Sequence, residues 1–86
     1  MDYKQKLEYQ SNYWYNDGLK KAQIRDLSGA IVSLKRSLQF NRENITARNL
    51  LGLVYYGRGE VAEALVEWII SKNFKGFREY CQLLYQ

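Results

Sequence analysis

The side chains that usually carry out catalysis are scarce in this 86-residue chain. It has no histidine and a single cysteine, Cys81. Histidine is the common base near neutral pH, and a cysteine without a histidine partner is a weak nucleophile. Glu60, Glu63 and Glu67 recur at helical spacing, but no polar or glycine-rich loop accompanies them, so we interpret this row as a solvated helix face. The sequence therefore predicts no enzymatic activity, no metal site and no cofactor.

Aromatic residues are the other chemically distinctive group, with eight tyrosines, two tryptophans and three phenylalanines. A tyrosine ring can be buried while its hydroxyl group stays hydrated, so these residues suit both helix packing and protein interfaces. The alternative is a site for single-stranded nucleic acid, in which lysines hold phosphates and tyrosines stack on bases. We rank nucleic acid second because a net charge of +4 is modest and no known motif is present. The residues of that alternative site are Lys4, Lys6, Lys20, Lys21, Tyr9, Tyr13 and Tyr15.

The composition places further bounds on the chain. No apolar run approaches the length of roughly 18 residues that a membrane-spanning helix needs, so we expect no membrane insertion of this segment. The N-terminal residues lack the apolar core of a signal peptide. Since the single cysteine cannot form an internal disulfide bond, these features together predict a cytoplasmic location.

The chain reads as helices joined by short turns, and it contains no proline. Asp26 and Asn44 are good N-caps for the segments that follow them. The Gly57–Gly59 segment predicts a helix end, since glycine accepts the positive φ that helix ends favour. We expect five helices, over residues 3–24, 27–40, 45–56, 60–72 and 77–85.

Two stretches of the chain match each other at an offset of 34 residues, with no gap. Small residues recur where paired helices must approach each other closely, and large residues recur where they fill the space between helices. Such a period predicts stacked helix-turn-helix units. The units cover about residues 11–44 and 45–78. Their matching pairs are Gly18 with Gly52, Ala30 with Ala64, Leu34 with Trp68, and Ser37 with Ser71.

The second unit resembles a tetratricopeptide repeat (TPR), on Leu51-Gly52, Tyr55, Ala64 and Trp68. The resemblance implies an all-α, tetratricopeptide-like right-handed solenoid of two repeats plus flanking helices, forming a single domain over residues 1–86. The first unit departs from the pattern: Arg25 stands where glycine is usual, and Asp17 and Lys21 form a polar pair that suits a wet end of the stack. The run over residues 47–55 is similar to repeats of bacterial proteins.

The resemblance also implies a function, that of a non-enzymatic module or scaffold which binds another protein or a peptide. In the family, the first helix of each repeat lines a concave groove. By register, the groove residues here are Asn12, Tyr15, Leu19, Ala22, Thr46, Asn49, Leu53 and Tyr56. The lysine and asparagine pair with which chaperone-binding members hold a C-terminal carboxylate is missing, so we expect no such binding. Because two repeats are few for a stable stack, we also expect a second copy as a partner in a homodimer.

Overall fold

The computed structural model describes residues 1–72, and this part of the chain is all helical. The predicted helix positions are confirmed to within a residue or two. The predicted helix over residues 77–85 and Cys81 lie outside the described residues, so four helices are described where about five were expected. They are α1 (Tyr3–Gln23), α2 (Leu27–Phe40), α3 (Ile45–Gly57) and α4 (Val61–Ser71).

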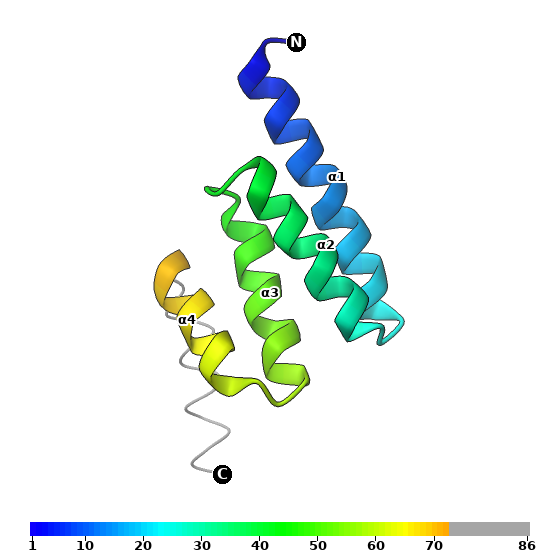
Figure 1. Cartoon of the computed structure of the whole chain (residues 1–86), viewed down its shortest axis with the longest axis vertical. Helices are drawn as coiled ribbons and strands as arrows, with labels where there is room; N and C mark the ends of the chain where they lie inside the picture. The colour runs from blue at the N-terminus through cyan, green and yellow to red at the C-terminus, as the bar shows by residue number, and fades with distance from the viewer. Residues whose placement is uncertain (73–86) are drawn as a thin grey trace.

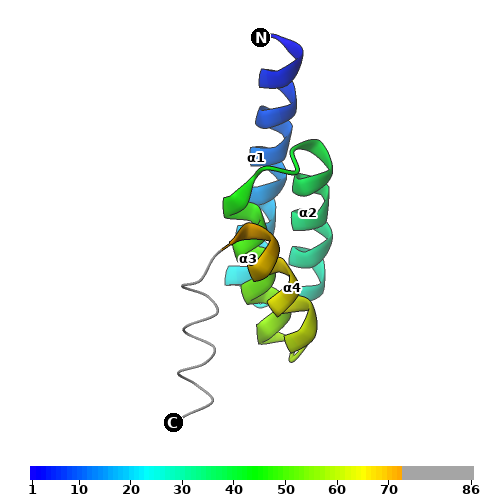
Figure 2. The same cartoon turned by 90° about the vertical axis from the view of Figure 1, so that its left-hand side faces the viewer.

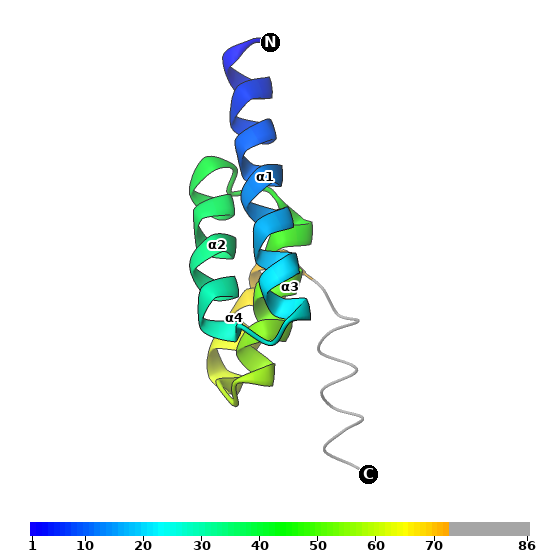
Figure 3. The ribbon, with the colours of Figure 1, turned by 90° about the vertical axis from the view of Figure 1, so that its right-hand side faces the viewer.

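The four helices form two antiparallel hairpins that lie side by side (Figure 1). The pair α1 and α2 forms one hairpin, and the pair α3 and α4 forms the other. Helix α2 packs against α3, and α1 makes a smaller contact with α3. Figures 2 and 3 show that the first turns of α1 project beyond the end of α2. The right-handed superhelix and the repeat bounds at residues 11–44 and 45–78 stay predictions.

Local side chains set the helix starts. The Asp26 carboxylate accepts a hydrogen bond from the Gly29 backbone N–H, and the Asn44 side chain accepts one from the Ala47 N–H. Both predicted N-caps are therefore confirmed. At the start of α1, Asp2 also forms a reciprocal capping box that the sequence did not lead us to predict.

The two turns inside the hairpins share one backbone conformation. Gly59 has φ of 84° and Arg25 has φ of 66°, and these residues are 34 positions apart. Glycine accepts this left-handed conformation readily, whereas an arginine adopts it at an energetic cost. The repeat therefore extends to the backbone of its turns, even where the side chain departs from glycine.

The core is built around two glycine contacts that also recur at the 34-residue offset. A Cβ atom placed on Gly18 would lie 2.8 Å from Leu34 Cγ, and one placed on Gly52 would lie 2.7 Å from Trp68 Cδ1. Each contact lets the two helices of a hairpin approach closely. The buried apolar cluster comprises Ala30, Ile31, Leu34, Ala47, Leu51, Val54, Tyr55, Ala64 and Trp68.

The exposure of Ile69 in α4 follows the repeat register. The apolar pattern of α4 groups Ile69 on one face with Trp68, but Ile69 is 70% exposed and Trp68 is 3% exposed. Ile69 is in register with Lys35 of α2, which is also exposed. The register between repeats therefore places Ile69 better than the apolar pattern of a single helix does.

Candidate binding surface

The predicted groove residues of the first unit lie along α1. Asn12 is exposed, whereas Tyr15, Leu19 and Ala22 are half-buried. Tyr15 and Ala22 pack against the apolar cluster, so part of each side chain takes part in the packing of the helices. The amide oxygen of Asn12 accepts a hydrogen bond of 3.3 Å from Nδ2 of Asn44.

The predicted groove residues of the second unit lie along α3. Thr46 is exposed and Leu53 is 49% exposed. Tyr56 is half-buried, with its ring centroid 6.2 Å from that of Trp68. Oδ1 of Asn49 is buried and accepts no hydrogen bond from any described residue. This second half offers both an exposed apolar side chain and an unsatisfied acceptor.

The structure places the two halves on helices that contact each other, α1 and α3. None of the eight residues is fully buried. The Asn12–Asn44 hydrogen bond lies where the two halves meet, since Asn44 directly precedes α3. The eight side chains therefore have accessible surface on two neighbouring helices, and their role in binding stays a prediction.

A buried polar cluster at the same end of the hairpins was missed from the sequence. The hydroxyl of Ser11 donates to the Ser37 carbonyl at 2.8 Å, and the hydroxyl of Ser37 donates to the Ser11 carbonyl at 2.7 Å. Nδ2 of Asn44 donates to Ser11 Oγ at 2.8 Å. One side chain thus caps α3 and also ties it to α1 and α2. The agreement of Ser37 with Ser71 at the 34-residue offset pointed to this position, but nothing pointed to its partners.

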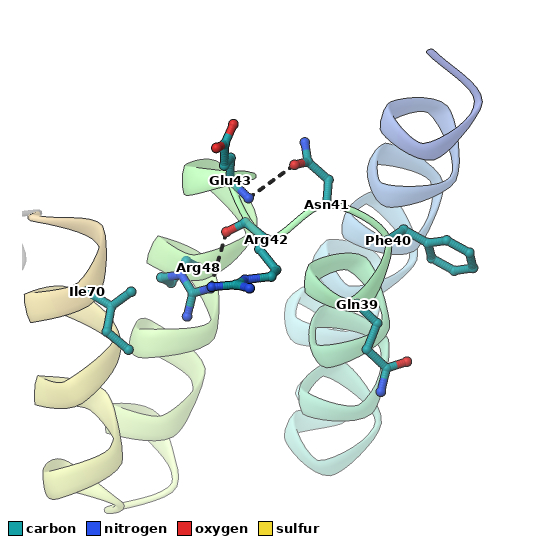
Figure 4. Close-up of a pocket in the computed structure, with 7 residues that line it drawn as sticks. All are labelled: Gln39, Phe40, Asn41, Arg42, Glu43, Arg48 and Ile70. Atoms are coloured by element: carbon teal, nitrogen blue, oxygen red, sulfur yellow. Dashed lines mark hydrogen bonds between the residues drawn. The ribbon is translucent and has the colours of Figure 1, made fainter. Parts of the chain in front are cut away.

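A hollow lies at the turn between α2 and α3, where residues of α2, the turn, α3 and α4 line it (Figure 4). Its volume is about 600 Å³. Nη1 of Arg48 lies 2.8 Å from a carboxylate oxygen of Glu67, and Nη2 donates to the Arg42 carbonyl at 3.2 Å. Because the Arg48 guanidinium already has these partners, the hollow does not offer it as a free anion site. The lining residues are Gln39, Phe40, Asn41, Arg42, Glu43, Arg48 and Ile70.

The acidic row of α4 does not converge on a common site. Glu67 pairs with Arg48 of α3, and Glu60 lies 3.3 Å from the guanidinium of Arg58. Glu63 is exposed. Within residues 1–72, no group of three or more potential metal-ligating side chains comes together, and no helix is long and apolar enough to cross a membrane.

We expected Asp17 and Lys21 of α1 to form a polar pair at a solvent-exposed end of the stack, but the structure shows that they also contact α2. Nζ of Lys21 lies 2.8 Å from Asp17 Oδ2, and the hydroxyl of Ser33 on α2 donates to the same oxygen at 2.5 Å. The hydrogen bond from Lys21, followed by the one from Ser33, lowers the pKa of the Asp17 carboxyl below its usual value. The pair therefore also holds α1 to α2.

Only some of the residues predicted for a nucleic-acid site are exposed and without a role in helix packing. Lys21 is engaged by Asp17 and Ser33, and Tyr15 packs against the apolar cluster. The other lysines and tyrosines of that set are exposed on α1: Lys4, Lys6, Lys20, Tyr9 and Tyr13.

Comparison with known proteins gives one partial match. A stretch of 45 residues is 42% identical to BBSome complex member bbs-4 of Caenorhabditis elegans. The matched stretch covers 52% of this chain but only 10% of the length of that protein. No family model matches the chain, and no solved structure matches it. The match is to a nematode protein, so it gives no support to the bacterial source that we expected.

Proposed function

We propose that this chain is a helical-repeat scaffold that binds an extended peptide or a helix of another protein along α1 and α3. The observation that carries the proposal is the accessible surface of all eight groove residues on two helices in contact. The partial match to a protein named as a member of a multi-protein complex also favours a role in protein assembly. The cytoplasmic location is part of the same proposal.

The chemistry of the α3 half supports a peptide as the ligand. Leu53 offers apolar surface, and a buried carbonyl oxygen without a partner, such as Oδ1 of Asn49, is unfavourable. A backbone N–H of a bound peptide would satisfy such an acceptor after a small rotation of the amide. Burial of apolar side chains beside that hydrogen bond would supply the remaining affinity.

The experiment uses Leu53→Arg, which places a charge in the middle of the proposed surface without opening the core. Partners cross-linked to the wild-type chain in cells are identified by mass spectrometry and then tested as purified proteins. We expect Leu53→Arg to abolish their binding, because an arginine side chain would prevent close apolar contact.

Val32→Arg is the matched control. Val32 is 57% exposed on α2, so the same charge is introduced, with a similar change in size, on a different helix. Purified partners that bind the Leu53→Arg and wild-type chains equally would place the binding surface elsewhere. Circular dichroism of both variants checks that their helices are intact.

A further inference from the structure

The outward face of α1 differs in chemistry from the corresponding face of α3. Ala47, Leu51 and Val54 of α3 belong to the buried cluster and are at most 4% exposed. In register, α1 carries Tyr13 and Lys20, both exposed, together with Asp17. The positions that are buried in α3 therefore carry polar or aromatic side chains with accessible surface in α1.

Four residues lie along this face, with Asn16 and Asp17 between the last two, and we call them the outer stripe: Lys6, Tyr9, Tyr13 and Lys20. Their spacing of three, four and seven residues places them on one side of an α-helix. Tyr9 is 60% exposed and Tyr13 is 56% exposed, and the two rings lie between the lysines. The lysines are about 21 Å apart along the helix at 1.5 Å per residue.

Tyr13, in the middle of the outer stripe, has a defined orientation. Its ring packs edge-on against Trp14, with the centroids 5.4 Å apart and the planes at 87°. The guanidinium of Arg36, on α2, lies 4.8 Å from the centre of the Trp14 ring. A hollow of about 240 Å³ lies beside the Tyr13 side chain and is lined by Tyr13, Asn16, Asp17 and Lys20. A side chain held in this way loses little entropy when a partner binds.

The two lysines of the outer stripe are exposed. Neither Lys6 nor Lys20 forms an ion pair with any residue in the described part of the chain. The nearby carboxylate of Asp17 is occupied by Lys21. A partner with acidic groups would therefore meet two exposed lysines that form no ion pair within residues 1–72.

We propose that the outer stripe is a second docking site, which binds an amphipathic helix of another protein through a central apolar patch flanked by acidic residues. Apolar side chains of that helix pack on Tyr9 and Tyr13, and its carboxylates pair with Lys6 and Lys20 at the two ends. This site is separate from the proposed α1 and α3 groove and does not depend on it.

A helix fits this surface better than single-stranded nucleic acid does. Proteins that bind single strands provide a positively charged groove that follows the phosphate backbone. The outer stripe is a row on one convex helix, and its two lysines are separated by two tyrosines. A straight helix laid along α1 would reach both lysines and cover both rings.

The test uses a fluorescently labelled helical peptide of about 20 residues, roughly 30 Å long. It carries leucines at its centre and glutamates about 21 Å apart, to match the lysines. Fluorescence anisotropy measures its affinity for the full chain. We expect Lys6→Glu/Lys20→Glu and Tyr9→Ala/Tyr13→Ala each to weaken binding by about tenfold or more, since like charges or lost ring contacts replace the attraction.

Lys4→Glu/Lys35→Glu is the matched control for the charge reversal, because it makes the same change at two exposed lysines that lie off the stripe, Lys4 on another side of α1 and Lys35 on α2. We expect it to leave the affinity within about twofold, and we expect a peptide with lysines in place of glutamates not to bind. An equal loss in the control variant would overturn the proposal, as would no binding of the acidic peptide at about 100 μM, a concentration at which even weak specific contacts are detectable. Tighter binding of oligo-deoxythymidine, lost in the Lys6→Glu/Lys20→Glu variant, would overturn it in favour of nucleic acid.

Discussion

Gly52 is the position at which one methyl group should reveal how closely the second hairpin is packed. In Gly52→Ala, the new Cβ would lie 2.7 Å from Trp68 Cδ1 and 3.0 Å from Cε2. Both distances are well inside van der Waals contact, and Trp68 is only 3% exposed. The indole ring is rigid and enclosed, so either the ring or the helix must move.

The expected magnitude follows from two opposing effects. Alanine in place of glycine inside a helix favours folding by about 1 kcal/mol. Overpacking of a filled core costs about 1–3 kcal/mol, and the rigidity of the indole places this site toward the upper part of that range. We therefore expect Gly52→Ala to lower the free energy of unfolding by about 1–2 kcal/mol.

Two other glycines serve as controls in the same urea titrations, followed by circular dichroism. A Cβ on Gly18 would meet Leu34 at 2.8 Å, but a leucine side chain can rotate, so we expect a smaller loss. A Cβ on Gly57 would meet only Leu27 Cδ1, at 3.6 Å, which is ordinary contact. Gly57→Ala should therefore stabilise the chain by several tenths of a kcal/mol, up to about 1.

The order of stability, with Gly57→Ala highest and Gly52→Ala lowest, is what tests the packing argument. Trp68→Leu provides a second check, because in that background the Gly52→Ala substitution should cost much less than in the wild type. The reasoning would be refuted by a Gly52→Ala chain as stable as the wild type, or by an equal loss in the presence and absence of the tryptophan.

Three further predictions concern the turns, the polar cluster and the ion pair. Gly59→Ala should lower the free energy of unfolding by about 1–2 kcal/mol because of its left-handed φ, whereas Arg25→Gly should leave it unchanged or raise it by up to about 1 kcal/mol; urea titration measures both. Asn44→Ala should lower the free energy of unfolding by roughly 2–3 kcal/mol in the same assay. Losing a helix cap alone typically costs about 1 kcal/mol, but the Asn44 side chain also donates a hydrogen bond to Ser11. The pKa of Asp17 is lower in the folded chain than its unfolded value of 3.8, so the carboxylate stabilises the fold at any pH above 3.8. This contribution is lost as the pH falls through the folded pKa. Asp17→Asn should therefore make the urea midpoint less dependent on pH below about pH 4, and an unchanged pH profile would argue against the pairing.

The helix positions could be predicted because they depend on local chemistry. Asp26 and Asn44 cap the residues directly after them, and Gly59 marks the turn before α4. The 34-residue register predicted the glycine contacts as well, since it aligned each small residue with its counterpart in the other unit. These features require only neighbours in sequence or in the repeat.

Features that depend on how three helices meet were not predictable in this way. Ser11 lies near the middle of a long helix, and its spacing gave no indication that its hydroxyl reaches Ser37 and Asn44. Similarly, the register of the repeat resemblance placed Tyr15 and Ala22 on the groove face, but only the folded structure shows that both also pack against the core. The sequence thus predicted which positions form the candidate surface, but it could not show how much of each side chain is exposed to solvent.

The double role of Asn44 has a consequence for how the two hairpins unfold. Repeat proteins can lose their units one after another when the contact between neighbouring units is weak. Here the side chain that begins α3 is also hydrogen-bonded to α1, so the first turn of α3 cannot open without weakening the junction between the hairpins. Amide hydrogens at the start of α3 should therefore exchange with solvent together with those around Ser11 and Ser37, in one cooperative opening and not as a frayed helix end.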